Sequence, residues 1–334
     1  MPQDAQYAYA VARIRAIEKN MIDKIKMDRM IEAKTAEEVL KLVVESGYGD
    51  SSSDLASAPN YEKLLKNEQK KLFSVLSKIV EDFEIFNLVT HSSDFHNVKV
   101  LLKADFLGKE DDDILLETGT IPISKLKIMT KERDFRDMSS YMRNAVEESI
   151  DVYNRTSDPQ KIDLLVDKAN YLQMLQTLSD LDSEFLEEIV EAKIDLLNIK
   201  TFLRIKKQGK SWDFLKKILL PGGHIDTDVF VSNIDSSYES IIELFRYTNY
   251  SLVCEKGIES YRSTDSLAIF EKLADDYVLS LAKKAKVMAF GIEPLICHFI
   301  GKENEIKNIR IIMVGKINNV PNETIRERLR EAYV

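Results

Sequence analysis

Apolar residues recur at steps of three and four along most of the chain, which is the spacing of one face of an α-helix. The first such stripe covers the N-terminal 25 residues and predicts one long amphipathic helix; its members are Tyr7, Val11, Ile14, Ile17, Met21 and Ile25. Thr35 and Glu38 then have the spacing of a capping box, in which the hydroxyl and the carboxylate accept free N–H groups reciprocally. The helix that follows is expected to end at Gly47.

The rest of the chain has the same helical texture. Pro59 can open a helix that continues from residue 61 to residue 83, or about seven turns. The periodicity returns over residues 162–203, 237–246 and 267–290. Strand-like alternation is scarce, and its best candidate is the Ile-rich run at residues 309–314. The pattern therefore predicts an all-α protein.

One short motif occurs three times: an acidic residue, two variable residues, asparagine, valine or isoleucine, and a basic residue. The copies are Asp94 with Asn97, Asp195 with Asn198, and Glu305 with Asn308. Apolar residues one, four and five positions after each asparagine form one helical face, so the motif is expected on a helix that packs against a core. We therefore expect the run at 309–314 to be helical like its two counterparts.

The repeats also predict domain boundaries. Residues 114–121 (ILLETGTI) resemble residues 218–225 (ILLPGGHI) at an offset of 104, and we interpret both segments as domain ends. The division is then into three helical repeat domains, 1–122, 123–224 and 225–334. Because little chain follows the third motif, the last domain is expected to take in a piece from elsewhere, such as the N-terminal helix.

The repeated asparagine is interpreted as a structural residue. A catalytic group repeated identically in three domains would be peculiar, whereas a buried amide needs hydrogen-bond partners because leaving it unpaired costs about 1–3 kcal/mol. We therefore expect a hydrogen-bonded polar node between packed helices.

Composition narrows the classes of function. The chain has 334 residues, 44% of them hydrophobic, and Asp plus Glu outnumber Lys plus Arg by 56 to 47, which argues against a nucleic-acid binder. The longest apolar stretches, such as residues 287–292 and 295–300, are far shorter than a membrane span. Charged residues, Asp4 among them, occupy the N-terminal region where a secretory signal has an uncharged core. We expect a cytosolic protein with two reduced, packed cysteines, Cys254 and Cys297.

Candidate ligand-binding motifs are weak. Gly209, Lys210 and Ser211 resemble the end of a phosphate-binding loop, but Arg204 stands where that loop needs a glycine, and the preceding residues have a helical pattern. No pair of histidines has metal-ligand spacing; they are His91, His96, His224 and His298.

A structural role also accounts better than a catalytic or binding role for the remaining candidate residues. Cys297 and His298 are neighbours that point about 100° apart on a helix, so they do not form a nucleophile and base pair. The acidic run at 110–113 lacks the spacing of a calcium loop. The lysines at 206–207, 216–217 and 283–286 are expected on solvated helix faces, with acidic partners or lipid head groups as the alternative. We predict no catalytic, cofactor-binding or metal-binding residue.

Several segments together resemble the C subunit of prokaryotic V-type and A-type ATPases, whose family includes the d subunit of eukaryotic V-ATPases. The segments are 7–16 (YAYAVARIRA), 45–49 (ESGYG), 195–204 (DLLNIKTFLR), 291–303 (GIEPLICHFIGKE), 308–316 (NIRIIMVGK) and 325–333 (IRERLREAY). The resemblance covers nearly the whole chain, and its motifs are jointly specific.

The resemblance implies a non-catalytic rotor part without cofactors. It implies three similar helical domains in a pseudo-threefold funnel, seated at the cytoplasmic face of the membrane rotor ring and receiving the shaft formed by the D and F subunits. Such a chain is peripheral to the membrane, is present as one copy per complex, and transmits torque that couples ATP to proton or sodium transport. The resemblance does not identify which residues of this chain contact the shaft or the ring.

Two alternatives stay open at this point. A generic α-helical scaffold with peptide-binding grooves would be expected to have short, near-identical repeats, whereas these repeats are about 100 residues long and strongly diverged. An enzyme would need turnover that depends on residues such as Cys297, His298 or Lys210.

Overall fold

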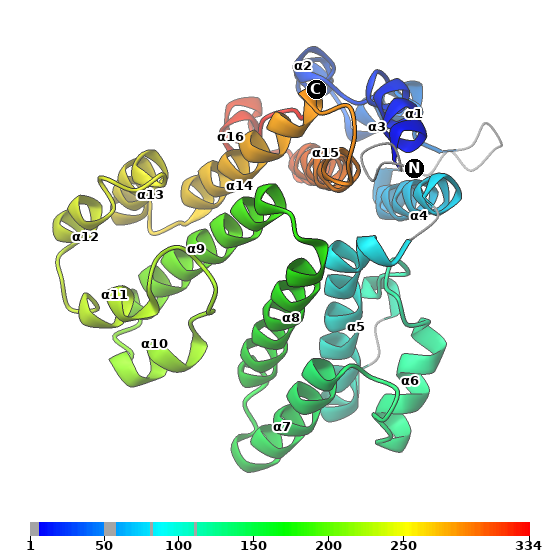
Figure 1. Cartoon of the computed structure of the whole chain (residues 1–334). Helices are drawn as coiled ribbons and strands as arrows, with labels where there is room; N and C mark the ends of the chain where they lie inside the picture. The colour runs from blue at the N-terminus through cyan, green and yellow to red at the C-terminus, as the bar shows by residue number, and fades with distance from the viewer. Residues whose placement is uncertain (1–6, 50–57, 81–82, 110–111) are drawn as a thin grey trace. The chain divides into compact units, whose positions relative to one another are not determined.

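The computed structural model describes residues 7–49, 58–80, 83–109 and 112–334, and within these ranges the regular structure is entirely helical (Figure 1). The prediction of an all-α fold is confirmed. The helices are α1 Ala8–Glu18, α2 Lys24–Glu32, α3 Ala36–Glu45, α4 Tyr61–Ile79, α5 Asn87–Leu107, α6 Ile123–Glu132, α7 Ser140–Thr156, α8 Gln160–Leu181, α9 Glu184–Lys207, α10 Trp212–Ile218, α11 Thr227–Ser232, α12 Tyr238–Leu244, α13 Ser251–Thr264, α14 Ala268–Lys283, α15 Glu293–Ile317 and α16 Asn322–Arg328. Short 3₁₀ turns occur at Ala58–Asn60, Phe83–Phe86, Asp112–Ile114 and Lys284–Val287.

The chain forms two compact units. One unit joins residues 1–81 to residues 236–334, and the other contains residues 82–235. The first unit therefore combines the two ends of the chain. The two units are defined by contacts in space, whereas the three repeat domains were defined by repeats in the sequence. The boundaries after residues 122 and 224 therefore remain a prediction.

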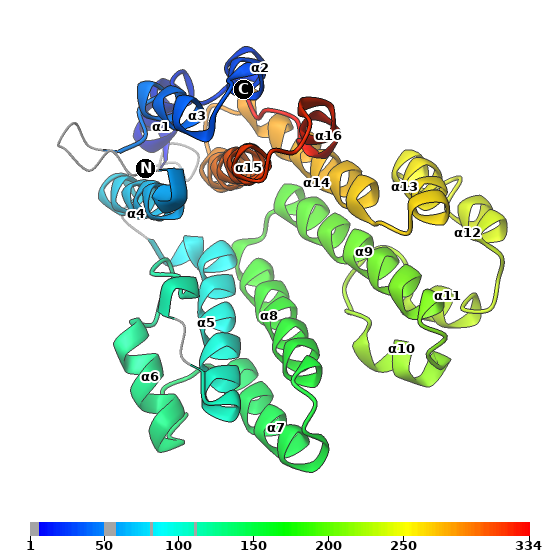
Figure 2. The same cartoon turned by 180° about the vertical axis from the view of Figure 1, so that it is seen from behind.

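The unit of residues 82–235 is built on α5, α7 and α8, which lie side by side with α6 packed on α5 (Figures 1 and 2). One apolar core of this unit takes residues from these four helices and their connections: Phe95, Val98, Leu101, Leu102, Leu115, Leu126, Met129, Phe135, Met138, Met142, Ala145, Val146, Ile162, Val166 and Ala169. The other unit has a core that joins α2, α3 and α4 to α15 and α16, with Ile31, Val39, Leu65, Ile312 and Ile325 among its buried members.

The prediction of one long N-terminal helix is wrong. Helix α1 ends at Glu18, and α2 begins after Asp23, whose side chain accepts the N–H of Lys26 at 2.8 Å. The backbone N–H of Ile22 is donated to the distant Glu305 side chain instead of to a helical carbonyl. Ile25 is 72% exposed, so it does not continue the buried stripe. A cap and one long-range acceptor therefore break a helix that periodicity alone would continue.

The capping box at Thr35 is confirmed in a modified form. The Thr35 hydroxyl accepts the N–H of Glu38 at 3.2 Å, and the Glu38 carboxylate accepts the N–H of Lys34 at 2.7 Å, one residue earlier than the reciprocal box requires. Helix α3 ends at Glu45, and Gly47 follows with a φ of 95°, which glycine adopts without steric cost.

The predicted helical faces are also confirmed. The apolar residues one, four and five positions after each repeated asparagine are all buried, namely Val98, Leu101 and Leu102, then Ile199, Phe202 and Leu203, then Ile309, Ile312 and Met313. Helix α15 runs through the whole Ile-rich segment, so the strand-like run is helical, as its counterparts predicted.

Candidate functional site: a carboxylate and asparagine clamp

The repeated asparagine binds the backbone of a segment that follows its own helix. In α5, Asn97 donates from Nδ2 to the carbonyl of Leu116 at 2.7 Å and accepts the N–H of Leu116 at Oδ1 at 2.8 Å. The same pair of bonds joins Asn198 of α9 to Leu220, both at 2.8 Å. Each amide is almost fully buried, so these bonds satisfy both of its polar ends.

The third copy uses the same geometry. Asn308 of α15 donates to the carbonyl of Arg330 at 3.1 Å and accepts the Arg330 N–H at 2.9 Å. The expected hydrogen-bonded node is therefore present in all three copies, although its partner is a downstream backbone and not a neighbouring helix. Only asparagine or glutamine offers both a donor and an acceptor in this arrangement, which explains the residue type.

The acidic residue of the motif holds two further N–H groups in the first two copies. Asp94 accepts the N–H of Thr120 at 2.9 Å and of Ile121 at 3.0 Å. Asp195 accepts the N–H of His224 and of Ile225, both at 3.1 Å. Both carboxylates are fully buried, and hydrogen bonds to an ionised acceptor are among the stronger ones. We call each acid and asparagine, with the backbone groups they bind, a clamp.

Two glycines make the clamp possible. A Cβ atom on Gly119 would lie 2.0 Å from Oδ1 of Asp94, and one on Gly223 would lie 2.1 Å from Oδ1 of Asp195. No side chain fits in these places, so the close approach of backbone to carboxylate requires glycine. The aligned segments at 114–121 and 218–225 contained this signal, but its meaning depends on knowing that the aspartate lies opposite.

The helices that carry the clamps also end alike. Eleven residues after each asparagine stands a residue in the left-handed region, with φ of 63° at Gly108, 61° at Gly209 and 52° at Asn319. The chain then turns back toward the clamp of the same helix. Helix, left-handed terminator and clamped segment thus form one repeated structural device.

In the third copy the acid is Glu305, and its partners come from the N-terminal region. Its carboxylate accepts the N–H of Ile22 at 2.5 Å and the hydroxyl of Tyr48 at 2.5 Å. Lys302, one turn earlier on α15, lies 2.7 Å from Glu305 and 3.0 Å from Glu68 of α4. Burial, together with the nearby charge of Glu305, raises the pKa of Tyr48 well above its ordinary value. These contacts tie α15 to residues of the N-terminal region.

A second buried cluster joins α1 to the same helix. Glu18 contacts Arg15 at 2.8 Å, and Nδ1 of His298 lies 3.5 Å from Oε1 of Glu18. Arg15 also donates to the carbonyl of Ala285 at 2.6 Å. Burial raises the pKa of Glu18, but His298 and Arg15 outweigh it and hold that pKa below its ordinary value. The buried His298 ring thus lies against the Glu18 carboxylate.

The other histidines are occupied separately. His96 bonds the carbonyl of Ile114 at 3.0 Å, Nε2 of His224 lies 3.1 Å from Glu191, and Nδ1 of His91 lies 3.8 Å from Asp94. In the part of the chain that the structure describes, no three His, Cys, Asp or Glu side chains come together in a way that could hold a metal ion.

The cysteines and the phosphate-loop look-alike have structural settings. Cys254 and Cys297 are reduced and buried, and burial raises the pKa of Cys254 to about 12. Gly209 lies just beyond α9, and the hydroxyl of Ser211 accepts the N–H of Phe214 at the start of the seven-residue α10. A helix therefore precedes Gly209, where a phosphate-binding loop would have a strand.

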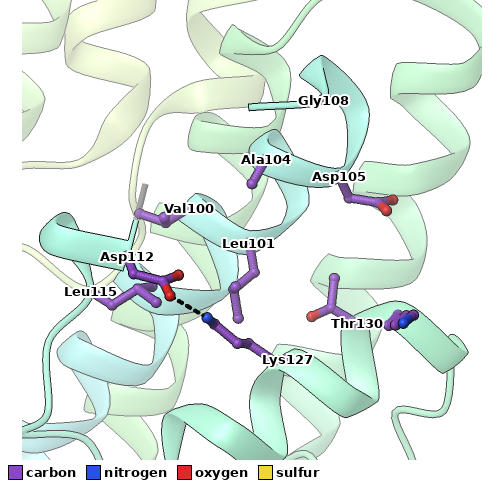
Figure 3. Close-up of a pocket in the computed structure, with 10 residues that line it drawn as sticks. Val100, Leu101, Ala104, Asp105, Gly108, Asp112, Leu115, Lys127 and Thr130 are labelled. Atoms are coloured by element: carbon purple, nitrogen blue, oxygen red, sulfur yellow. Dashed lines mark hydrogen bonds and ion pairs between the residues drawn. The ribbon is translucent and has the colours of Figure 1, made fainter. Parts of the chain in front are cut away.

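A shallow pocket of about 540 Å³ lies between α5 and α6. Its apolar lining includes Leu101 and Leu115, and Figure 3 shows Lys127 extending to Asp112, with 2.6 Å between their charged atoms. Residues 110 and 111 of the acidic run lie outside the described residues, while Asp112 is held by this ion pair. Among the described residues, no helix is both long enough and apolar enough to cross a bilayer.

Comparison with known proteins decides the family. The family model for the ATP synthase (C/AC39) subunit matches residues 10–328. The chain belongs to this family. The resemblance to the C subunit of V-type and A-type ATPases is thereby confirmed.

Relatives in this family match over almost the full chain. The C subunit of the A-type ATP synthase of Methanocaldococcus jannaschii is 29% identical over 97% of this chain and 86% of the relative. The C subunit of the V-type sodium ATPase of Enterococcus hirae is 28% identical over 96% of this chain and 97% of the relative. The C subunit of the A-type ATP synthase of a Desulfurococcus species is 26% identical over 96% and 90%, respectively. The first two clamps and Asn308 lie within the matched residues 10–328, and Arg330, the partner of Asn308, lies two residues beyond them.

Proposed function

We propose that this chain is a non-catalytic connector in the central stalk of a rotary V/A-type ATPase, linking the shaft of the D and F subunits to the membrane rotor ring. The observation that carries the proposal is the family match over residues 10–328. The chain would lie at the cytoplasmic face of the membrane, be held there through the ring, and be present as one copy per complex. Its three repeat domains, 1–122, 123–224 and 225–334, would enclose the end of the shaft in a funnel.

The clamps give this proposal a mechanical basis. Torque passes through a connector only if its parts resist twisting, and each clamp ties a long helix to a segment about 20 residues downstream through buried hydrogen bonds. Close-packed interiors have low compressibility and transmit strain. Hydrogen bonds to a buried carboxylate are strong, so they hold the clamped segment firmly against its helix. The role would thus be to carry torque that couples ATP turnover to ion transport.

A non-catalytic role also accounts for the reactive residue types. His96, His298 and Cys254 are each bound to neighbours or buried among packed residues. The generic scaffold alternative has no observation in its favour beyond helicity itself.

The experiment is co-expression of the tagged chain with the D and F subunits and the ring, followed by copurification from detergent-solubilised membranes. We expect recovery of both shaft and ring, and no ATPase activity from the isolated chain. The same co-expression with the untagged chain is the control for non-specific capture. Failure of the folded chain to copurify with either shaft or ring would overturn the proposal.

A further inference from the structure

The end of α9 and the start of α10 form a strongly basic corner on an acidic protein. Residues 204–217 contain six basic residues and one acidic residue, whereas the whole chain has a net charge of −9. The basic residues are Arg204, Lys206, Lys207, Lys210, Lys216 and Lys217, and all except Lys206 are exposed. We call residues 204–217 the basic corner. In Figures 1 and 2 it lies where the end of α9 leads into α10.

An exposed aromatic residue stands in the middle of this corner. Trp212 is the single tryptophan of the chain and is 56% exposed. Exposure of a large apolar ring to water does not stabilise the fold. Tryptophan is also among the residue types most enriched at the centres of protein interfaces. Lys210, two positions earlier, is exposed and has no acidic partner in the described residues.

The fold does not require this chemistry. Lysines in the last turn of a helix complement its dipole, which would account for Lys206 and Lys207. However, α5 ends with the same left-handed glycine and the same clamp, and its last turn has no basic residue. After its Gly108 and Lys109 the first repeat continues with acidic residues, including the exposed Asp112 and Asp113. The clamp therefore forms whether acidic or basic residues follow the left-handed glycine. The basic residues and the tryptophan of the second repeat are not needed for the clamp, and a role in binding accounts for them.

Lysines of the corner have partners within the chain, and Lys206 donates to the carbonyl of Ile234 at 2.9 Å. Lys217 lies 2.8 Å from Asp213, and Lys216 lies 3.5 Å from Asp228. Both pairs are exposed, and exposed pairs contribute little and exchange readily. The positive charge of the corner therefore suits an acidic surface with an apolar recess for Trp212.

We propose that the basic corner, with Trp212 as its apolar anchor, docks an acidic surface of the shaft formed by the D and F subunits. This inference rests on the proposed function. The shaft is favoured over the ring because cytoplasmic loops of membrane proteins carry an excess of Lys and Arg, which a basic corner would repel. It is favoured over a lipid surface because the corner offers one large apolar side chain, where membrane-binding segments present several.

The test measures binding of a purified D–F complex to the chain, with a matched control. Lys210→Glu/Trp212→Ala reverses one charge of the corner and removes its anchor. Lys109→Glu makes the same charge reversal at the corresponding position of the first repeat, which also follows a left-handed glycine. All three side chains are exposed, so unchanged thermal unfolding is expected and is checked first. We expect the double variant to bind at least about tenfold more weakly and Lys109→Glu to stay within about twofold of the wild type.

A direct readout comes from the single tryptophan. With 5-fluorotryptophan incorporated, the chain has one ¹⁹F resonance from Trp212, which should shift or broaden when unlabelled D–F complex is added. Wild-type affinity should also fall as ionic strength rises, because opposite charges are screened.

The remaining outcomes separate the two proposals. If the wild type binds the D–F complex and the double variant binds it equally well, the docking surface is overturned and the proposed function stands. If the wild type does not bind the complex at all, the proposed function itself fails. If the double variant loses binding only to detergent-solubilised ring, or only to phosphatidylserine vesicles, the corner serves that partner and the proposal for the shaft is overturned.

Discussion

Glu305 accepts the backbone N–H of Ile22 at 2.5 Å, although 283 residues separate the two along the chain. The same carboxylate accepts the Tyr48 hydroxyl at 2.5 Å, so one side chain of α15 binds two points of the N-terminal region. Asp94 and Asp195 hold segments that lie about 30 residues downstream, whereas Glu305 reaches across nearly the whole chain. This bond therefore helps to join the two ends of the chain into one compact unit.

Replacing Glu305 should destabilise that unit. Glu305→Ala leaves the Ile22 N–H and the Tyr48 hydroxyl without their acceptor in a buried site and removes one partner of Lys302. We expect a loss of about 2–4 kcal/mol in the free energy of unfolding, measured by urea denaturation. Glu327→Ala, at an exposed position of α16, is the control and should change stability by less than about 0.5 kcal/mol. Equal stabilities of the two variants would contradict this account.

Gly223→Ala should act through the carboxylate opposite. The added methyl group would lie 2.1 Å from Oδ1 of Asp195, so the clamp must open or shift, at a cost of about 2–3 kcal/mol. In an Asp195→Ala background the clash with the carboxylate is absent and the nearest remaining contact is Cγ2 of Ile194 at 3.3 Å, so the same glycine substitution should cost markedly less. A double-mutant cycle measures this difference. Purely additive effects would show that the glycine serves some purpose other than the clamp.

Asn198→Asp should be more damaging than its small change in shape suggests. The amide donates to the Leu220 carbonyl and accepts the Leu220 N–H, and a carboxylate can only accept. The variant places a buried charge against a carbonyl oxygen, so we expect at least about 2 kcal/mol of destabilisation. Stability that recovers as the pH is lowered would identify the ionised carboxylate as the cause, because a protonated carboxyl can donate.

Glu18 should contribute a pH-dependent part of the stability. Its pKa in the folded state is held below the ordinary value of 4.5, so the unfolded chain binds its proton more readily. The contribution is therefore fully present above about pH 4.5 and is lost as the pH falls through the folded pKa. Urea unfolding of wild type and Glu18→Gln across this range should give a difference that shrinks toward acid pH. A constant difference would mean that Glu18 acts through packing alone.

The two cysteines should be unreactive in the folded protein. Both are buried, and burial raises the pKa of Cys254 to about 12, so almost no thiolate exists near pH 8. A thiol reagent such as Ellman's reagent should label native protein negligibly and both thiols after unfolding in urea. Rapid labelling of one thiol per native chain would contradict the packing described here.

Sequence alone determined the features that depend on neighbours along the chain. Helical periodicity reports which residues share a face, so the all-α class and the buried faces after Asn97, Asn198 and Asn308 were predicted correctly. The capping residue Thr35 acts within one turn and was likewise recognised. The repeated motif identified the clamp residues, since repetition is visible without any structure.

Only the tertiary structure decided which distant groups these residues bind. The break between α1 and α2 depends partly on a carboxylate 283 residues away, so local periodicity predicted a continuous helix there. The need for Gly119 and Gly223 likewise follows from aspartates that fold onto them. Hydrogen-bond geometry acts over about 3 Å in space, whatever the separation in sequence, and a pattern read along the chain contains no such distances.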